Sequence, residues 1–281
     1  MMQTLPRGPV MADVQAFQLS EAERQRLLDP AVGGVILFRR NFENVAQLKA
    51  LVAEIKALRT PELIIAVDHE GGRVQRFIEG FTRLPAMNVL GEMWDEQGEA
   101  AAKAAAEQAG WVLAAELSAC GIDLSFTPVL ALNWGQCAVI GNRSFHQSAE
   151  IVAELARALQ KGLNKGGMKA CGKHFPGHGF VEGDSHHVLP QDNRSLAELE
   201  AADMVPFCKL AAEGMAAVMP CCARWPTGSS IWCVPAISFA ATAATSISLC
   251  STTPPATWPE RAPRNGAWQS KAWPFLMAGW Y

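Results

Sequence analysis

Four of the six histidines of this chain lie within one stretch of fifteen residues, Lys173 to His187. The stretch reads Lys-His-Phe-Pro-Gly-His-Gly-Phe-Val-Glu-Gly-Asp-Ser-His-His, and its glycines allow the backbone to approach a ligand closely. The small, apolar run at 167–172 precedes it and predicts a buried strand. Lys173 and His174 are therefore expected where a strand ends, and the loops after strands are where α/β folds place their chemistry.

Two kinds of chemistry fit this histidine-rich loop. In the first, Asp184 and His186 form a dyad: the carboxylate orients the imidazole and supports its charged form, and the imidazole transfers a proton. In the second, the loop supplies metal ligands from His174, His178, Asp184, His186 and His187. No spacing in the loop matches a known zinc signature. A solvated loop without a role is the third interpretation.

A second candidate site follows the apolar run at 63–67, which predicts another buried strand. It begins with Asp68 and continues through paired glycines to Arg76. A carboxylate accepts hydrogen bonds from two neighbouring hydroxyls, so Asp68 suits a sugar ligand. The alternative is a loop carboxylate paired with Arg73 or Arg76. Arg143, which stands between Asn and Ser, is by default a surface arginine.

Strands alternate with helices along the rest of the chain. Strands are expected at 32–38, 63–67, 122–132, 167–172 and 216–220, and helices at 45–58, 99–119, 148–163 and from 196 onward, where Pro206 kinks or breaks the helix. This order is typical of a parallel α/β fold. A doubly wound sheet would be expected to carry a glycine-rich phosphate loop after its first strand, and none is present. The fold class predicted is therefore α/β, a (β/α)8 TIM-type barrel with its site at the carboxyl ends of the strands.

The composition excludes several classes of protein. A net charge of −3 without a basic stripe argues against nucleic acid as a partner. No stretch of about 18 apolar residues is present, so no membrane span is expected, and the N-terminus lacks the apolar core of a signal peptide. The four cysteines before Pro220 show no paired spacing, which indicates reduced thiols and a cytoplasmic location.

Five motifs occur in a fixed order, and together they are far more specific than any one alone. They closely resemble the bacterial β-N-acetylhexosaminidases of glycoside hydrolase family 3, the cytoplasmic enzymes of peptidoglycan recycling. The resemblance covers roughly residues 8 to 220. The motifs are Gly33-Gly-Val-Ile-Leu-Phe38, Asp68-His-Glu-Gly-Gly72, Val139-Ile-Gly-Asn-Arg-Ser-Phe145, Lys173-His-Phe-Pro-Gly-His-Gly179 and Asp184-Ser-His186.

The resemblance implies an enzyme that removes terminal N-acetylglucosamine from muropeptides that carry 1,6-anhydro-N-acetylmuramic acid, with no metal or organic cofactor. It implies that His186 is the acid/base and that Asp184 supports it. The nucleophile would be an aspartate, whereas most retaining glycosidases use two carboxylates. It also implies a set of sugar-binding residues: Asp68, Arg76, Arg143, Lys173 and His174.

Two departures from the family pattern stand out. Where the family commonly has Asp-x-Asp after Pro-Val-Leu, this chain reads Ala131-Leu132-Asn133, so acidic side chains that make sugar-pocket or structural contacts are missing. The family carries its nucleophile in a strand that ends Phe-Ser-Asp-Asp-Leu, beyond the Lys-His pair. Here no aspartate follows Asp203. Without a nucleophile the covalent intermediate cannot form.

The composition changes abruptly after Pro220. The last 61 residues hold six of the nine Trp, four of the eight Cys and a single acidic residue, Glu260. We therefore divide the chain into a barrel domain at 1–220 and an aberrant tail at 221–281, and we interpret the tail as translated out of frame. The alternative is a genuine but unusual tail. Loss of the last two βα units predicts an incomplete barrel with open strand edges and poor folding.

Three functions follow as hypotheses. The first is a glycosidase by lineage, expected to be a monomer that acts on a small glycan, with little turnover in this chain. The second is a non-catalytic sugar-binding remnant that uses the five sugar-binding residues. The third is a metallohydrolase built on the histidine-rich loop.

Overall fold

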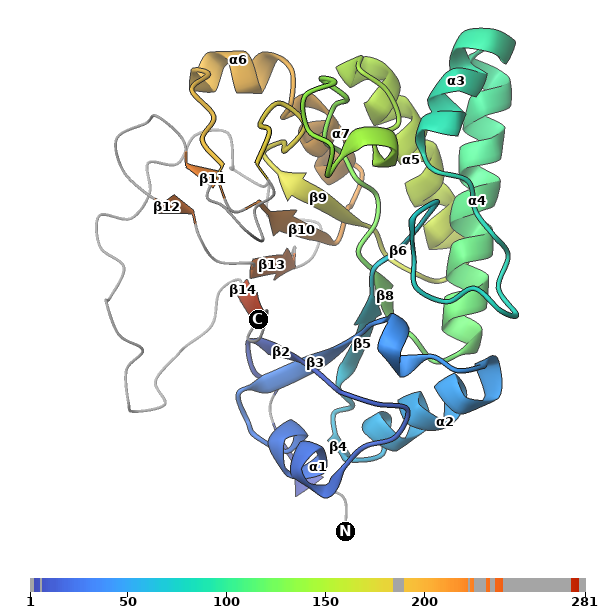
Figure 1. Ribbon diagram of the computed structural model, residues 1–281, viewed down its shortest axis with the longest axis vertical. Helices are drawn as coiled ribbons and strands as arrows, with labels where there is room; N and C mark the ends of the chain where they lie inside the picture. The colour runs from blue at the N-terminus through green and yellow to red at the C-terminus, as the bar shows by residue number, and fades with distance from the viewer. Residues whose placement is uncertain are drawn as a thin grey trace.

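The fold is organised around one sheet of eight strands, with helices packed against it (Figure 1). The computed structural model describes residues 3–5, 7–183, 190–221, 223–224, 231–232, 236–239 and 274–277. In spatial order the strands of the sheet are β8 (Leu124–Ser125), β5 (Ile64–Val67), β3 (Val32–Leu37), β2 (Val10–Asp13), β14 (Pro274–Met277), β13 (Ala236–Phe239), β10 (Ala217–Pro220) and β9 (Cys171–Phe175).

Within the eight-stranded sheet, the strands up to Pro220 pair in parallel with one another, as the alternation of strands and helices predicts. β2, β3, β5 and β8 pair in parallel in that order, and β9 pairs in parallel with β10. Isolated parallel bridges from Leu124 to Lys169 and from Val129 to Lys173 connect the two ends of the sheet. The sheet therefore curls back on itself in the TIM-barrel-like manner expected for this α/β chain.

The interior of this curled sheet is filled by side chains from successive strands. Each of the parallel strands contributes at least one residue to a single buried cluster, in the manner of the layered core of a barrel. The cluster consists of Met11, Ile36, Ala66, Leu124, Phe126, Cys171, Ala217 and Met219. Burial raises the pKa of the Cys171 thiol to about 12, so this cysteine acts as a core residue rather than a nucleophile.

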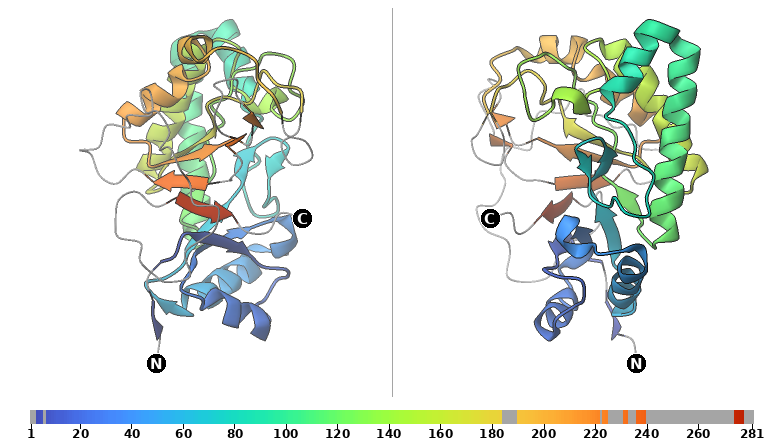
Figure 2. Two further views of the ribbon diagram at one scale, coloured as in Figure 1. Left: turned by 90° about the vertical axis from the view of Figure 1, so that its left-hand side faces the viewer. Right: turned by 45° about the vertical axis from the view of Figure 1, so that its right-hand side comes forward.

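Helices cover the outside of the sheet, and Figure 2 shows this layer from two further directions. α4 and α5 pack closely against each other because Gly110 and Gly162 face the partner helix, where an added Cβ would lie 2.2 and 2.0 Å from backbone oxygens. The helices are α1 (Glu21–Leu27), α2 (Val45–Lys56), α3 (Asn88–Gln97), α4 (Glu99–Ala119), α5 (Ala149–Lys165), α6 (Leu196–Ala201) and α7 (Val205–Ala212). In the part of the chain described, no helix is long and apolar enough to cross a membrane.

Two strand predictions need correction in their bounds. The strand expected at 167–172 is β9, Cys171–Phe175, so Lys173 and His174 lie within the strand rather than after it, because pairing with β10 continues to Phe175. The strand expected at 122–132 is regular only over β8, since Pro128 has no N–H to donate to a neighbour. The break expected at Pro206 is confirmed, because α6 ends before it and α7 begins beside it.

The chain beyond β10 departs from the barrel pattern. β13 runs antiparallel to both β10 and β14, and no helix occurs among the residues described after Pro220. In the described part of the chain the βα alternation therefore ends at β10, in keeping with an incomplete (β/α)8 barrel. The prediction of open strand edges is wrong for β2 and β10, because β14 and β13 pair with them, each over two residue pairs.

Smaller elements complete the fold. β6 (His69–Gly71) and β7 (Val74–Gln75) form an antiparallel hairpin, and two short 3₁₀ helices, η1 (Arg39–Asn41) and η2 (Gly141–Arg143), follow β3 and precede α5. The remaining short pairs are β1 (Gln3–Thr4) with β4 (Arg59–Thr60), and β11 (Ala223–Arg224) with β12 (Ile231–Trp232).

Candidate active site

The β6–β7 hairpin positions the first group of candidate residues at the carboxyl end of β5. Asp68 directly follows β5, Glu70 lies in β6, and Arg76 follows β7. The hairpin turns at Gly71 and Gly72, whose φ angles of 118° and 55° favour glycine. The turn folds the chain back so that Arg76 comes near Asp68, with a guanidinium-to-carboxylate distance of 3.9 Å.

Lys173 of β9 bridges two of these carboxylates. Its ammonium lies 2.6 Å from an Asp68 oxygen and 2.5 Å from a Glu70 oxygen. The side chains of Lys173 and Glu70 are only 1% and 2% exposed, and Asp68 is 14% exposed. Residues 105 positions apart thus meet at the strand ends. The least accessible charges are paired with each other, as buried charges must be.

Arg143 comes to the same place from η2. Its Nη2 and Nε donate to the two Glu70 carboxylate oxygens over 2.7 and 2.9 Å, and its Nη1 donates to the Val139 carbonyl over 3.1 Å. The side chain is 11% exposed, so the default expectation of a surface arginine is wrong. A planar guanidinium that is held along one edge by a carboxylate and at its third nitrogen by a carbonyl has a fixed orientation.

We call these five residues, Asp68, Glu70, Arg76, Arg143 and Lys173, the strand-end cluster. Burial alone would raise the pKa of the Glu70 carboxyl, but Lys173 and Arg143 outweigh it and lower that pKa to about 2. Glu70 is therefore ionised at neutral pH and fixes two cations. Asp68, which is more exposed, keeps carboxylate lone pairs for ligand hydroxyls. Such an arrangement suits recognition of a polyhydroxyl ligand at the open edge of the cluster.

Glu70 is the member of the cluster that the sequence reasoning missed. It lies in the motif around Asp68, yet no role was assigned to it. A charge-balance argument could have found it, because Lys173 and Arg143 near the ends of buried strands require carboxylate partners. The proposed alternative for Asp68, pairing with Arg73 or Arg76, is met only by Arg76. Arg73 instead donates to backbone carbonyls of the loop before η2.

The histidines are only partly placed. His174 follows Lys173 in β9, and its ring centroid lies 6.1 Å from that of the buried His178. Asp184 and His186, the predicted dyad, lie outside the described residues. A hollow of about 390 Å³ borders the described part of their loop, lined among others by Phe180, Glu182 and Gln191.

A metal site is not found among the residues that the structure describes: no three His, Cys, Asp or Glu side chains there are grouped to hold an ion. His187, one of the five ligands considered, also lies outside the described residues.

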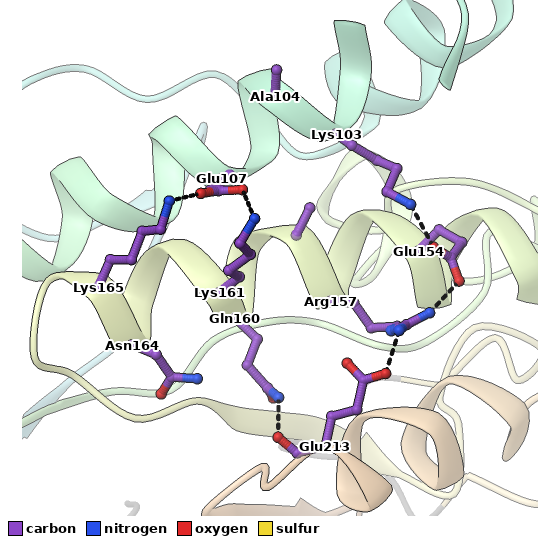
Figure 3. Close-up of a pocket in the computed structure, with 11 residues that line it drawn as sticks. Lys103, Ala104, Glu107, Glu154, Arg157, Gln160, Lys161, Asn164, Lys165 and Glu213 are labelled. Atoms are coloured by element: carbon purple, nitrogen blue, oxygen red, sulfur yellow. Dashed lines mark hydrogen bonds and ion pairs between the residues drawn. The ribbon is translucent and has the colours of Figure 1, made fainter. Parts of the chain in front are cut away.

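A second hollow, larger than the one beside the histidine-rich loop, lies between α4 and α5 (Figure 3). It measures about 830 Å³, and ion pairs link most of the charged side chains around it. These charges already satisfy each other on the outer helical layer, away from the strand ends. We therefore assign ligand chemistry to the strand-end cluster. We call the charged residues of this hollow the helix-face cluster: Lys103, Glu107, Glu154, Arg157, Lys161, Lys165 and Glu213.

Fold and site together define the class of protein. A TIM-barrel-like α/β sheet with a convergent charged cluster at the strand ends is typical of barrel enzymes that bind polar ligands there. The sequence profile of the glycosyl hydrolase family 3 N-terminal domain matches residues 8–235. The chain belongs to this glycoside hydrolase family.

Several bacterial proteins are similar to this chain over about four-fifths of its length. A β-hexosaminidase of Neisseria meningitidis serogroup A / serotype 4A is 78% identical over 222 residues, which is 79% of this chain and 62% of that protein. This chain thus spans about three-fifths of the relative's length. The crystal structure of NagZ from Neisseria gonorrhoeae in complex with N-trifluoroacetyl-D-glucosamine is 75% identical, with a TM-score of 0.78, over 80% of this chain and 66% of that one. NagZ from the same organism in complex with zinc ion is 74% identical, with a TM-score of 0.77 and the same coverage.

Proposed function

We propose that this chain carries the sugar-binding part of a β-N-acetylhexosaminidase site and binds terminal N-acetylglucosamine. The observation that carries the proposal is the convergence of Lys173 and Arg143 on Glu70 at the strand ends, where Lys173 also pairs with Asp68. Asp68 offers acceptors to sugar hydroxyls, while Arg143 and Arg76 offer donors from fixed positions. A relative of 75% identity that binds a glucosamine derivative supports this choice of ligand.

The parent reaction that we propose is retaining hydrolysis of terminal β-linked N-acetylglucosamine from 1,6-anhydro-muropeptides, in cytoplasmic peptidoglycan recycling. His186 would donate and later accept the proton, supported by Asp184, and no cofactor is needed for this step. The nucleophile has no counterpart, since the last aspartate is Asp203. We therefore infer that this chain, acting as a monomer, binds the sugar with negligible turnover.

Two measurements test this proposal together. Release of nitrophenol from nitrophenyl N-acetylglucosaminide should be negligible, and turnover comparable to that of a full-length relative would refute the inference. Titration with N-acetylglucosamine, followed by calorimetry or ligand-observed NMR, should show binding that Asp68→Asn abolishes. Glu107→Gln on the helix face is the matched control and should bind as the wild type does. If Asp68→Asn binds the sugar as tightly as the wild type does, the sugar does not bind at the strand-end cluster.

We further propose that 1–220 is the family domain and 221–281 an out-of-frame tail. The support is the abrupt change in composition near Pro220 and the length of 222 residues over which two Neisseria β-hexosaminidases align with the chain. Sequencing the coding DNA and translating all three frames tests this. A strand ending Ser-Asp-Asp-Leu in another frame is the expected result. If neither other frame is family-like, the tail is genuine.

A metal site at the histidine-rich loop is the second candidate function, favoured by the zinc ion named for one relative. Elemental analysis after dialysis against a chelator separates the two candidates. Stoichiometric zinc that survives dialysis, together with metal-dependent hydrolysis, would favour the metallohydrolase. Sugar binding that is unchanged by the chelator is expected from the strand-end cluster.

A further inference from the structure

A second buried ionic cluster joins the two described stems of the histidine-rich loop, residues 177–183 and 190–194. Its centre is Arg194, whose side chain is 11% exposed. The guanidinium donates to both carboxylate oxygens of Asp192, over 3.1 Å from Nε and 2.7 Å from Nη2. Its Nη1 donates to Asp203 over 2.6 Å. Asp192 and Asp203 have side chains that are 0% exposed.

The other face of Arg194 holds the first stem. Its guanidinium carbon lies 4.0 Å from the ring centroid of Phe180 and 5.3 Å from that of Trp134. Phe180 and Trp134 meet edge to face, with ring centroids 5.7 Å apart. Arg194 therefore contacts an aromatic residue of the first stem and a carboxylate of the second. A cation over aromatic rings is attracted by their negative faces, most strongly where water is excluded.

Asp203 ties the two stems to the rest of the fold. It lies between α6 and α7, and its Oδ1 accepts a hydrogen bond from Trp134 Nε1 over 3.0 Å. The backbone of Gly177 lies against it, since an added Cβ there would be 2.6 Å from the same oxygen. Four segments therefore meet at one guanidinium: the chain after β8, the first stem, the second stem and the turn between α6 and α7.

We propose that Arg194 is a positioning residue that holds the two stems of the histidine-rich loop at a fixed separation after β9, the strand that brings Lys173 to the strand-end cluster. The proposal rests on the proposed function in assigning a ligand to that cluster. Neutralising the two buried carboxylates requires contacts with Asp192 and Asp203 only. Arg194 also stacks on Phe180, and this contact connects it to the first stem. A lysine keeps the charge but cannot reproduce the bidentate contact and the planar stack together.

Hydrogen–deuterium exchange of peptides that cover 181–191, read by mass spectrometry in the full chain, tests the proposal. Arg194→Met should speed exchange in these peptides by roughly tenfold or more, because the stems lose their common anchor. The exchange rate in Arg194→Lys should lie between the rates in Arg194→Met and in the wild type. Arg157→Met is the matched control: Arg157 also joins two carboxylates, Glu154 and Glu213, but on the helix face. It should leave exchange at 181–191 unchanged.

Ligand-dependent protection separates positioning from simple stabilisation. In the wild type, N-acetylglucosamine at ten times its Kd should slow exchange at 181–191 by up to about tenfold. In Arg194→Met this protection should be lost while the sugar still binds. Retained protection in a folded Arg194→Met, or exchange equal to the wild type without sugar, would overturn the proposal. If the wild type does not bind the sugar, the proposed function is wrong. The ratio of the exchange rates of Arg194→Met and the wild type, measured without sugar, still tests the role of Arg194.

Phe180→Leu covers the case in which Arg194→Met does not fold. This variant leaves both ion pairs in place and removes only the aromatic face. Exchange in the peptides at 181–191 should increase roughly threefold, in line with the loss of one cation–π contact. Exchange equal to that of the wild type would show that Arg194 has no hold on the first stem.

Discussion

The strand-end cluster and the helix-face cluster use the same chemistry in opposite surroundings. In each, a lysine lies between two carboxylates: Lys173 is 2.6 Å from Asp68, and Lys103 is 2.7 Å from Glu154. The distances barely differ, but the exposure does. Lys173 is 1% exposed, whereas Lys103 is 36% exposed. The comparison shows that distance alone does not identify a functional ion pair.

Burial changes both the energetics and the use of such a network. An exposed pair is screened by water and salt and contributes little to stability. A buried pair loses its hydration, so each charge depends on its partner and on the geometry between them. The strand-end cluster is therefore rigidly specified, with Glu70 fixing Lys173 and Arg143. Such fixed donors and acceptors can recognise a ligand without reorganising, which the exposed helix-face cluster cannot do.

The sharpest way to break the comparison is Lys173→Met. It leaves Asp68 and Glu70 close together at a buried site with one cation fewer, so the free energy of unfolding should fall by roughly 3–5 kcal/mol. Binding of N-acetylglucosamine should be lost with it. Urea denaturation followed by circular dichroism measures the first effect, and calorimetric titration the second.

Lys103→Met is the matched control for this prediction. It removes a lysine that also contacts two carboxylates, Glu99 and Glu154, but in water. The free energy of unfolding should fall by well under about 1 kcal/mol, which is typical of exposed pairs, and sugar binding should not change. Equal losses for the two variants would mean that burial does not distinguish the clusters.

The pH dependence of stability sharpens the comparison further. Burial, helped by Arg76, lowers the pKa of His69 from 6.5 to about 4. The unfolded chain therefore binds a proton at this histidine before the folded chain does, and stability falls as pH falls from about 6.5 to 4. The loss between pH 7 and 5 should be roughly 2 kcal/mol, from a shift of this size.

His69→Phe should remove that part of the pH dependence. The ring of His69 packs against Phe77 and Phe81, with centroids 5.7 and 5.6 Å away, so phenylalanine suits the site. Urea denaturation at pH 7, 6 and 5 measures the slope. The carboxyl of Glu70, whose pKa falls from 4.5 to about 2, contributes to the pH dependence mainly below pH 5 and adds little to this slope. A slope in His69→Phe as steep as in the wild type would assign the dependence to other groups.

The sequence predicted the elements that carry clear signals. The continuous apolar runs predicted at 32–38 and 63–67 form β3 and β5, and the helices predicted at 45–58 and from 196 onward begin at the Asn44 cap and the Ser195–Glu198 capping box. The sequence analysis did not predict β2, whose apolar run is only three residues long, or the seven-residue α1. Short elements carry too few residues for periodicity to distinguish them.

Four of the five sugar-binding residues that the resemblance implies, Asp68, Arg76, Arg143 and Lys173, lie together at one end of the sheet. Their role in binding a sugar stays a prediction, and the contacts between them were not predicted. That Glu70 joins two of them depends on the hairpin turning at Gly71 and Gly72, a tertiary feature that spacing does not encode. Arg194 shows the same limit: its partners come from four separate segments. The placement of Asp184 and His186 stays a prediction.

Glu154→Gln tests the expectation that the exposed helix-face cluster contributes little to stability. Glu154 contacts Lys103 over 2.7 Å and Arg157 over 2.6 Å, and its side chain is 22% exposed. Its loss should lower the free energy of unfolding by about 0.5–1 kcal/mol at low salt, and by less at 1 M NaCl, where the Debye length is about 3 Å. Urea denaturation at both salt concentrations measures this. A loss above about 2 kcal/mol that salt does not reduce would show that the helix-face cluster is specified as tightly as the strand-end cluster, and the ligand assignment would then need a criterion other than burial.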